Sequence, residues 1–173
     1  MKRLGLLRHA KSDWNDMSLR DFDRGLNTRG RKGAALMGGQ VGPAWDMILA
    51  SPAQRVRCTL DASGLAIPTT FDERVYLADS TTLADLLRAL DDAQDAVLLV
   101  GHNPGLHDLV LELISPHTDH SAVTSISAKF PTAAFADLEL QIDHWRDLAD
   151  GCARLVRFAR PRDIDSDLGP QRG

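Results

Sequence analysis

The sequence contains little cysteine, few aromatic residues and no long apolar run. Its 173 residues include only two cysteines, Cys58 and Cys152, which are far apart and form no CxxC pattern. This spacing argues against a disulfide framework or a structural zinc site, and it predicts two buried thiols in a reducing cytoplasm. The longest apolar run, Ala96 to Val100, has five residues, whereas a membrane span needs about 20. We therefore expect a cytoplasmic protein without a membrane partner.

Basic residues are not in excess either. The chain has 20 Lys and Arg against 24 Asp and Glu, so its net charge is -4, which argues against a nucleic-acid partner. The hydrophobic share of 43% is that of an ordinary globular domain, and the length suits one domain. We expect a single domain over residues 1–160. Residues 161–173 are charged and poor in large apolar side chains, and they predict a flexible C-terminal tail.

Strand and helix patterns alternate along the chain. Short apolar runs predict strands at residues 4–8, 46–50, 68–75, 95–100, 133–142 and 154–158. Helical spacing or capping signals predict helices over about 28–41 with Asn27 or Thr28 as the cap, from a capping box at Ser51 as far as Gly64, over 82–90, and after a cap at Asn103. The alternation indicates an α/β fold with three layers, α/β/α, and a mostly parallel sheet. The last two strands are close in sequence and predict an antiparallel edge near the C-terminus.

Three of the predicted strands end in arginine or histidine. The first ends in Arg8-His9, the second leads into Arg55 in a first helical turn, and the fourth leads into His102. Ligands of open α/β sheets bind at the carboxyl ends of the strands, so we expect these side chains to meet at one edge. Arginine binds phosphate oxygens in pairs, and a neutral imidazole can attack phosphorus. This set predicts phosphoryl chemistry without a metal or another cofactor.

The residues around these positions carry a family resemblance. Leu7-Arg8-His9-Ala10 resembles the Arg-His-Gly signature of the histidine phosphatase (phosphoglycerate mutase-like) superfamily. Ser51-Pro52-Ala53-Gln54-Arg55 is similar to its Ser-Pro-x-x-Arg segment, and Gly101-His102-Asn103-Pro104 is similar to its second-histidine segment. The resemblance spans residues 3–160, and the short chain most resembles the SixA-type phosphohistidine phosphatases.

The resemblance implies roles for individual residues. His9 would be the phosphorylated nucleophile, and Arg8, Arg55 and His102 would bind the phosphoryl group around it. The substrate-binding residues implied in addition are Asp21, Arg24 and Asn103.

Two features depart from the family pattern. Ala10 replaces the usual glycine. The proton donor to the leaving group is open, and Asp21, Glu73 and Asp79 are the candidates. A phosphohistidine leaving group, once protonated, needs less help from an acid than an alkoxide does, which leads to the hypothesis that the protein works without one.

These residues favour a metal-independent phosphatase that forms a phosphohistidine on His9 and removes phosphate from phosphohistidine in a protein. The absence of large insertions favours an open pocket that admits a protein side chain. The alternatives are a small-molecule phosphomonoesterase and a phosphate-binding module without turnover. The expected partner is thus a phosphorylated protein or a small phosphate ester. His117 and His120, which flank Asp119, are interpreted as solvated loop residues in preference to metal ligands.

Overall fold

The computed structural model describes residues 1–170 and contains a mixed sheet of six strands in the order β3-β2-β4-β1-β5-β6. The strands are β1 (Lys2–Arg8), β2 (Met47–Ala50), β3 (Thr69–Phe71), β4 (Ala96–Gly101), β5 (Phe135–Leu140) and β6 (Ala153–Ala159). The first four strands pair in parallel, whereas β5 pairs antiparallel with both β1 and β6. The predicted α/β class and the antiparallel edge near the C-terminus are confirmed.

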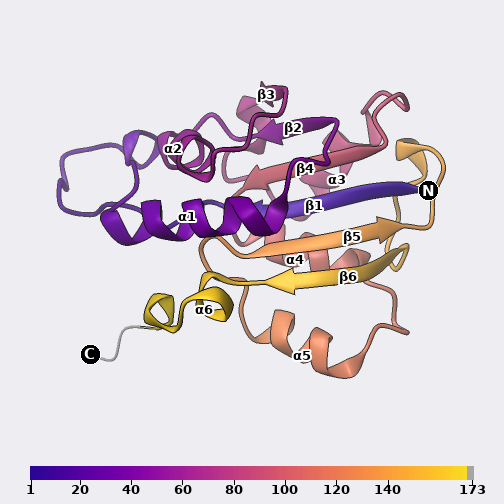
Figure 1. Ribbon diagram of the computed structural model, residues 1–173. Helices are drawn as coiled ribbons and strands as arrows, with labels where there is room; N and C mark the ends of the chain where they lie inside the picture. The colour runs from indigo at the N-terminus through magenta and orange to yellow at the C-terminus, as the bar shows by residue number, and fades with distance from the viewer. Residues whose placement is uncertain (171–173) are drawn as a thin grey trace.

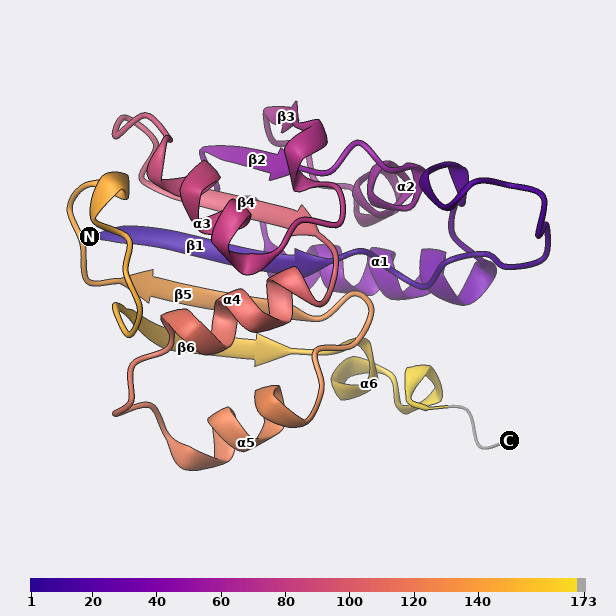
Figure 2. The ribbon, with the colours of Figure 1, turned by 180° about the vertical axis from the view of Figure 1, so that it is seen from behind.

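Helices cover both faces of the sheet. They are α1 (Thr28–Val41), α2 (Gln54–Ser63), α3 (Ser80–Arg88), α4 (Gly105–Leu113), α5 (His120–Ala128) and α6 (Pro161–Ile164). Figure 1 shows α1 and α2 in front of the sheet, and Figure 2 shows α3 and α4 over the opposite face. Two separate clusters of buried apolar side chains fill the spaces between sheet and helices. This is the predicted three-layer arrangement.

Capping explains where most helices begin, with two differences from prediction. Asn27 caps α1 as expected, because its side chain accepts from the Gly30 amide at 2.7 Å. The helix α2 begins at Gln54 and not directly after Ser51; the Ser51 hydroxyl accepts from the Ala53 amide at 3.2 Å and is also hydrogen-bonded to a histidine of the neighbouring strand end. The predicted cap at Asn103 is wrong: Pro104 occupies the N-cap position of α4, and the Asn103 amide donates to the Phe130 carbonyl instead.

The segment after β6 is ordered over its first part. Pro161 is buried at the start of α6, and a 3₁₀ turn follows at Ser166–Leu168. The Arg29 guanidinium of α1 donates to the carbonyl oxygens of Asp167 and Gly169. This segment therefore packs on α1 within the region predicted as a tail, and residues 171–173 lie outside the described residues.

The parallel register brings the ends of three strands together. Arg8 pairs with Gly101 across β1 and β4, and Ala50 pairs with Val100 across β2 and β4. The residues that follow these strands therefore lie side by side at one edge of the sheet. Among residues 1–170 no helix combines the length and the apolar character needed to cross a membrane.

Candidate active site

Four side chains that follow strand ends form a cluster at this edge, which we call the strand-end cluster: Arg8, His9, Arg55 and His102. The rings of His9 and His102 lie 5.2 Å apart between centroids. Arg55 Nη2 lies 3.3 Å from His102 Nδ1. The structure thus brings together the four residues that the sequence predicted. His9, Arg55 and His102 are 7%, 4% and 3% exposed, so the cluster is more covered than the expected open pocket.

The His9 ring is held in one tautomer by the backbone of the next residue. Its Nδ1 lies 2.7 Å from the Ala10 carbonyl oxygen, and a carbonyl oxygen only accepts, so Nδ1 carries the proton. Nε2 therefore carries the lone pair in the neutral ring. Within residues 1–170 no group donates a hydrogen bond to Nε2. The atom that would attack phosphorus is left unprotonated and unpaired.

The His102 ring is fixed in the other tautomer, with its proton on Nε2. Arg55 can only donate, so His102 Nδ1 accepts from its Nη2. His102 Nε2 then carries the proton and donates to Ser51 Oγ at 2.8 Å. Ser51 is the first residue of the Ser-Pro-x-x-Arg segment, and its hydroxyl orients the second histidine.

Burial keeps both histidines neutral at physiological pH. Desolvation is the main cause that lowers the pKa of His9 to about 4, and the nearby Arg8 and Arg55 lower it further, although the bond to Ala10 acts in the other direction. Desolvation, His9 and Arg55 lower the pKa of His102 to about 3. A neutral imidazole is the form that attacks phosphorus.

The two arginines give the cluster a positive field. Burial lowers the pKa of Arg8, and the charge of Arg55 lowers it further, which shows that the two guanidinium groups act on each other. Arg8 Nη1 donates to the Phe130 carbonyl at 3.2 Å, while its buried Nε has no acceptor among the described residues. Two neighbouring guanidinium groups with a free donor suit an anion between them.

The short 3₁₀ turn at Asp21–Asp23 places a carboxylate next to Arg55. Asp21 accepts from Arg55 Nη2 at 3.0 Å, and also from Arg24 and from the Tyr76 hydroxyl. Burial acts to raise the pKa of Asp21, but the hydrogen bonds from Tyr76 and Arg55 outweigh it and hold the pKa below its ordinary value. Asp21 is therefore an ionised partner of arginine, and not a neutral acid.

The other two candidate proton donors lie away from these contacts. Asp79 caps α3 by accepting from the Thr82 amide at 2.8 Å, and this hydrogen bond lowers its pKa. Glu73 is exposed in the 3₁₀ turn Glu73–Val75, and its carboxylate makes no hydrogen bond with residues 1–170. Neither residue contacts the strand-end cluster through a hydrogen bond. The candidate substrate-binding residue Asn103 lies beside Arg8, because both donate to the Phe130 carbonyl.

The turn after His9 is fixed by its neighbours. The Ala10 amide donates to Thr59 Oγ1 at 2.9 Å, and this hydroxyl in turn donates to the Arg55 carbonyl at 2.7 Å. A Cβ atom at Gly30 would collide with the Lys11 carbonyl, so only glycine lets the start of α1 approach this turn. The Ala10 methyl is fully buried.

Sequence reasoning missed two residues that hold the site together, Thr59 and Tyr76. Tyr76 donates to Asp21, and its ring packs edge-on against His102 at 5.4 Å between centroids. It is the only tyrosine of the chain, but no local pattern indicates that it reaches the site. Asp119 caps α5, which the sequence did not predict, with His117 and His120 exposed beside it. Among the described residues no three His, Cys, Asp or Glu side chains gather as a metal site would need.

Comparison with known proteins agrees with this geometry. The sequence profile of the histidine phosphatase superfamily (branch 1) matches residues 4–78. An uncharacterized protein of Mycobacterium tuberculosis, Rv1276c, is 39% identical over 160 residues, which are 90% of this chain and 100% of the relative.

Solved structures agree over nearly the whole chain. The SixA protein of Nakamurella multipartitia, a candidate phosphohistidine phosphatase, superimposes with a TM-score of 0.81 at 27% identity and covers 92% of this chain and 96% of its own. The SixA protein of Agrobacterium tumefaciens, also a candidate phosphohistidine phosphatase, has a TM-score of 0.74 at 31% identity, covering 92% and 98%. Sequence profile, relatives and fold lead to one conclusion: the chain belongs to branch 1 of the histidine phosphatase superfamily.

Proposed function

We propose that the protein is a phosphatase that uses His9 as a nucleophile and removes phosphate from phosphohistidine in another protein. The observation that carries this proposal is the bond from His9 Nδ1 to the Ala10 carbonyl at 2.7 Å. It leaves the Nε2 lone pair free, in the field of the Arg8 and Arg55 guanidinium groups. Family membership supports the phosphatase chemistry, and the site geometry supports the choice of substrate.

In the first step, His9 Nε2 attacks phosphorus opposite the leaving group. The N–P bond to His9 forms as the bond between phosphorus and the substrate nitrogen breaks, and that electron pair leaves with the substrate ring. Arg8 and Arg55 neutralise the charge on the phosphoryl oxygens. The His9 ring becomes cationic because it keeps its Nδ1 proton, and the Ala10 carbonyl stabilises this charge.

In the second step, water attacks phosphorus and the N–P bond to His9 breaks. The electron pair returns to Nε2, one water proton passes to solvent, and inorganic phosphate leaves. The protein cations supply the positive charge that both steps need, so the scheme requires no metal.

The state of the carboxylates supports phosphohistidine over an alkyl phosphate. An alkoxide leaving group needs a neutral acid, but Asp21 is ion-paired and Asp79 caps a helix. A phosphohistidine ring that is protonated before the reaction leaves as neutral imidazole and needs no acid from the protein. Efficient hydrolysis of alkyl phosphates that is lost in Glu73→Gln alone would contradict this argument.

The surface beside the site supports a protein substrate. Trp14, Met17 and Leu19, in the loop between β1 and α1, are 58%, 78% and 43% exposed. Neighbouring exposed apolar side chains are typical of surfaces that bind proteins. Cys58 and Cys152 are only partly buried, so the prediction of two buried thiols is wrong. We place the activity of the protein in the cytoplasm.

The test is phosphate release from a phosphohistidine-containing protein and from an aryl phosphate, each with and without a chelator. Wild type is compared with His9→Ala, and His117→Ala serves as the control because His117 is exposed. We expect release that survives the chelator, is lost in His9→Ala, and is faster for phosphohistidine. Rapid quenching traps an acid-labile, alkali-stable phosphoenzyme in wild type and in His117→Ala but not in His9→Ala.

Other results refute parts of the proposal. Faster release from the aryl phosphate assigns the protein to small-molecule phosphomonoesterases. Binding of the phosphoprotein without release from either substrate makes it a phosphate-binding module. Release that His9→Ala retains contradicts the nucleophile.

A further inference from the structure

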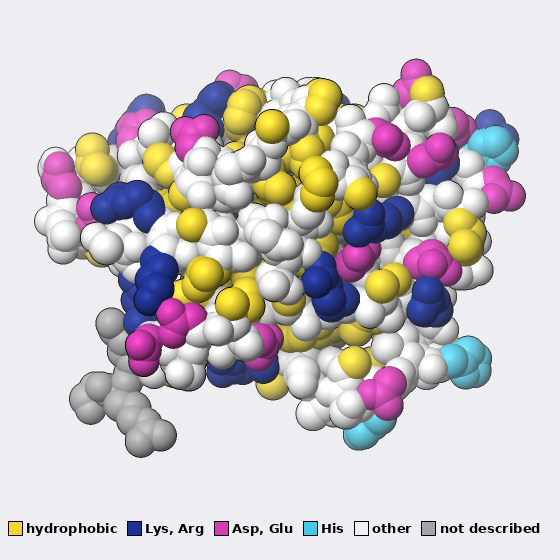
Figure 3. Space-filling model, viewed as in Figure 1, with side chains coloured by type: hydrophobic (Ala, Val, Ile, Leu, Met, Phe, Trp, Pro, Cys, Tyr) yellow, Lys and Arg dark blue, Asp and Glu magenta, His cyan; other side chains and the backbone are white. Residues whose placement is uncertain are grey.

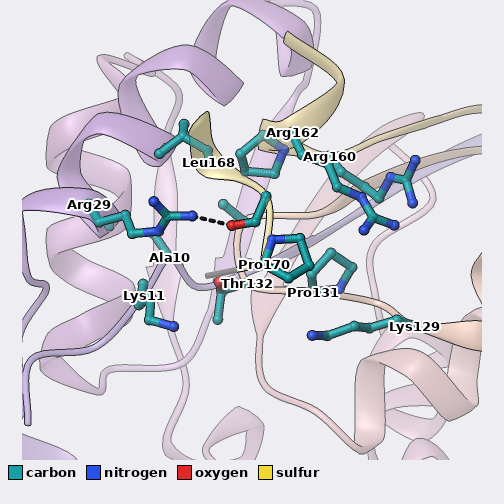
Figure 4. Close-up of a pocket in the computed structure, with 15 residues that line it drawn as sticks. Ala10, Lys11, Arg29, Lys129, Pro131, Thr132, Arg160, Arg162, Leu168 and Pro170 are labelled. Atoms are coloured by element: carbon teal, nitrogen blue, oxygen red, sulfur yellow. Dashed lines mark hydrogen bonds between the residues drawn. The ribbon is translucent and has the colours of Figure 1, made fainter. Parts of the chain in front are cut away.

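A pocket of about 110 Å³ lies beside the strand-end cluster. Its walls come from four parts of the chain: the turn after β1, the start of α1, the connection from α5 to β5, and the segment around α6 (Figure 4). Ala10 lines it, and the carbonyl of this residue is the one that holds His9. On the other side, the Ala133 amide donates to the carbonyls of Arg8 and His9. One wall of the pocket is thus the turn that follows the proposed nucleophile.

The pocket concentrates positive charge. Five of its lining side chains are basic and none is acidic: Lys11, Arg29, Lys129, Arg160 and Arg162. This contrasts with the whole chain, in which acidic residues outnumber basic ones by 24 to 20. Figure 3 shows Lys and Arg side chains along the left side of the face that carries α1 and α6, with acidic side chains beside them. No acidic side chain lines the pocket itself.

Most of these cations form no direct ion pair. Arg160 pairs with Asp163 at 2.8 Å. The other four basic side chains form no ion pair with residues 1–170, although the charge of Arg162 acts on Asp163 and that of Arg29 on Asp165. The Arg29 guanidinium is oriented by two backbone carbonyls. The buried Nε of Arg162 has no acceptor among the described residues. A pocket with five basic side chains, no acidic lining residue and an open donor suits an oxyanion.

The size and the other lining residues restrict the ligand further. Pro131, Pro161 and Leu168 give the pocket apolar walls, which strengthen charge interactions by excluding water. Its volume of about 110 Å³ leaves room for one carboxylate or phosphate on a short stem.

We propose that this basic pocket binds a second anionic group of the substrate, an acidic side chain next to the phosphohistidine, while the phosphoryl group lies against His9. The inference rests on the proposed function, since it assumes a substrate that reaches His9. It makes the protein selective for phosphohistidine with Asp or Glu nearby.

The test compares two phosphohistidine peptides of equal length, one with Asp and Glu around the phosphohistidine and one with Asn and Gln. Their dissociation constants are measured by calorimetry in a His9→Ala background, where turnover does not interfere. We expect the acidic peptide to bind about 10-fold more tightly, as two exposed charge contacts would give. The double substitution Lys129→Gln and Arg162→Gln reduces this ratio to about 2 or less.

The matched control is Arg146→Gln, which removes one exposed positive charge in the 3₁₀ turn Trp145–Asp147, beyond the opposite end of β5. We expect Arg146→Gln to leave the ratio of the two dissociation constants unchanged. Equal binding of the two peptides before the pocket is changed overturns the inference. So does a ratio that Lys129→Gln with Arg162→Gln leaves unaltered.

Two further measurements are needed. The first distinguishes a substrate subsite from a site for free anions, and the second distinguishes a failure of the pocket proposal from a failure of the proposed function. Sodium sulfate that binds to the pocket without changing the peptide ratio identifies a site for free anions, which overturns the inference. Phosphate release by the wild type is assayed on the same peptides: absent release with a preserved binding ratio refutes the proposed function alone. Release without any preference between the two peptides refutes the role proposed for the pocket and leaves the proposed function intact.

Discussion

The two buried neutral histidines make folding stability depend on pH. The pKa of His9 is about 4 and that of His102 about 3 in the folded protein, whereas both are about 6.5 in an unfolded chain. The unfolded state therefore binds protons first as the pH falls. The contribution of each histidine is fully present above about pH 6.5 and is lost as the pH decreases towards the folded pKa.

The size of the effect follows from the pKa of His9. Between about pH 7 and pH 5 the unfolded chain takes up nearly one proton at His9 and the folded protein almost none. This costs about 2 kcal/mol, or about 1 kcal/mol per pH unit near pH 5. The variant His9→Asn cannot take up this proton. The difference in unfolding free energy between wild type and variant should therefore shrink by about 2 kcal/mol over this interval.

Urea denaturation at a series of pH values, followed by the fluorescence of the buried Trp45 and Trp145, measures this difference. His117→Asn is the control, because His117 is exposed and lies outside the strand-end cluster. Curves for wild type and His9→Asn that stay parallel from pH 7 to pH 5 would refute the assignment of a buried, neutral nucleophile.

Three other substitutions test the supports of the site. Tyr76→Phe removes a donor to the ionised Asp21 and should lower the unfolding free energy by about 1–2 kcal/mol in urea denaturation; no loss would show that this bond contributes nothing. Thr59→Val leaves the buried Ala10 amide without its acceptor. It should cost about 1–3 kcal/mol and slow phosphoenzyme formation in quenched-flow experiments, whereas an unchanged rate would separate this turn from His9. Gly30→Ala forces a methyl against the turn after β1 and should lower the melting temperature by about 4–8 °C; an unaltered melting curve would contradict the close approach.

The part of the site that sequence could predict is the part that strand order determines. Arg8, His9 and His102 follow β1 and β4, which are adjacent parallel strands, so their meeting follows from where the strands end. Arg55 was placed correctly because the first turn of a helix after a strand returns to the same edge. The Asn27 cap was predictable because it depends only on the backbone of the next three residues.

Contacts between distant segments could not be predicted in this way. Tyr76 reaches Asp21 across 55 positions, and Ser51 reaches His102 across 51. Local pattern assigned Ser51 to a capping box, but its hydroxyl bonds both to the Ala53 amide and to His102, and α2 begins only at Gln54. Asp79 shows the reverse case: a carboxylate that was a candidate acid serves an ordinary helix cap.

The pair between Asp21 and Arg55 has a consequence for product inhibition. Under the proposed function, an anion that binds Arg55 must compete with a carboxylate that already holds the guanidinium at 3.0 Å. This competition weakens the binding of inorganic phosphate to Arg55. When phosphate leaves, Arg55 regains its resident counterion. Product release is then an exchange of counterions at Arg55.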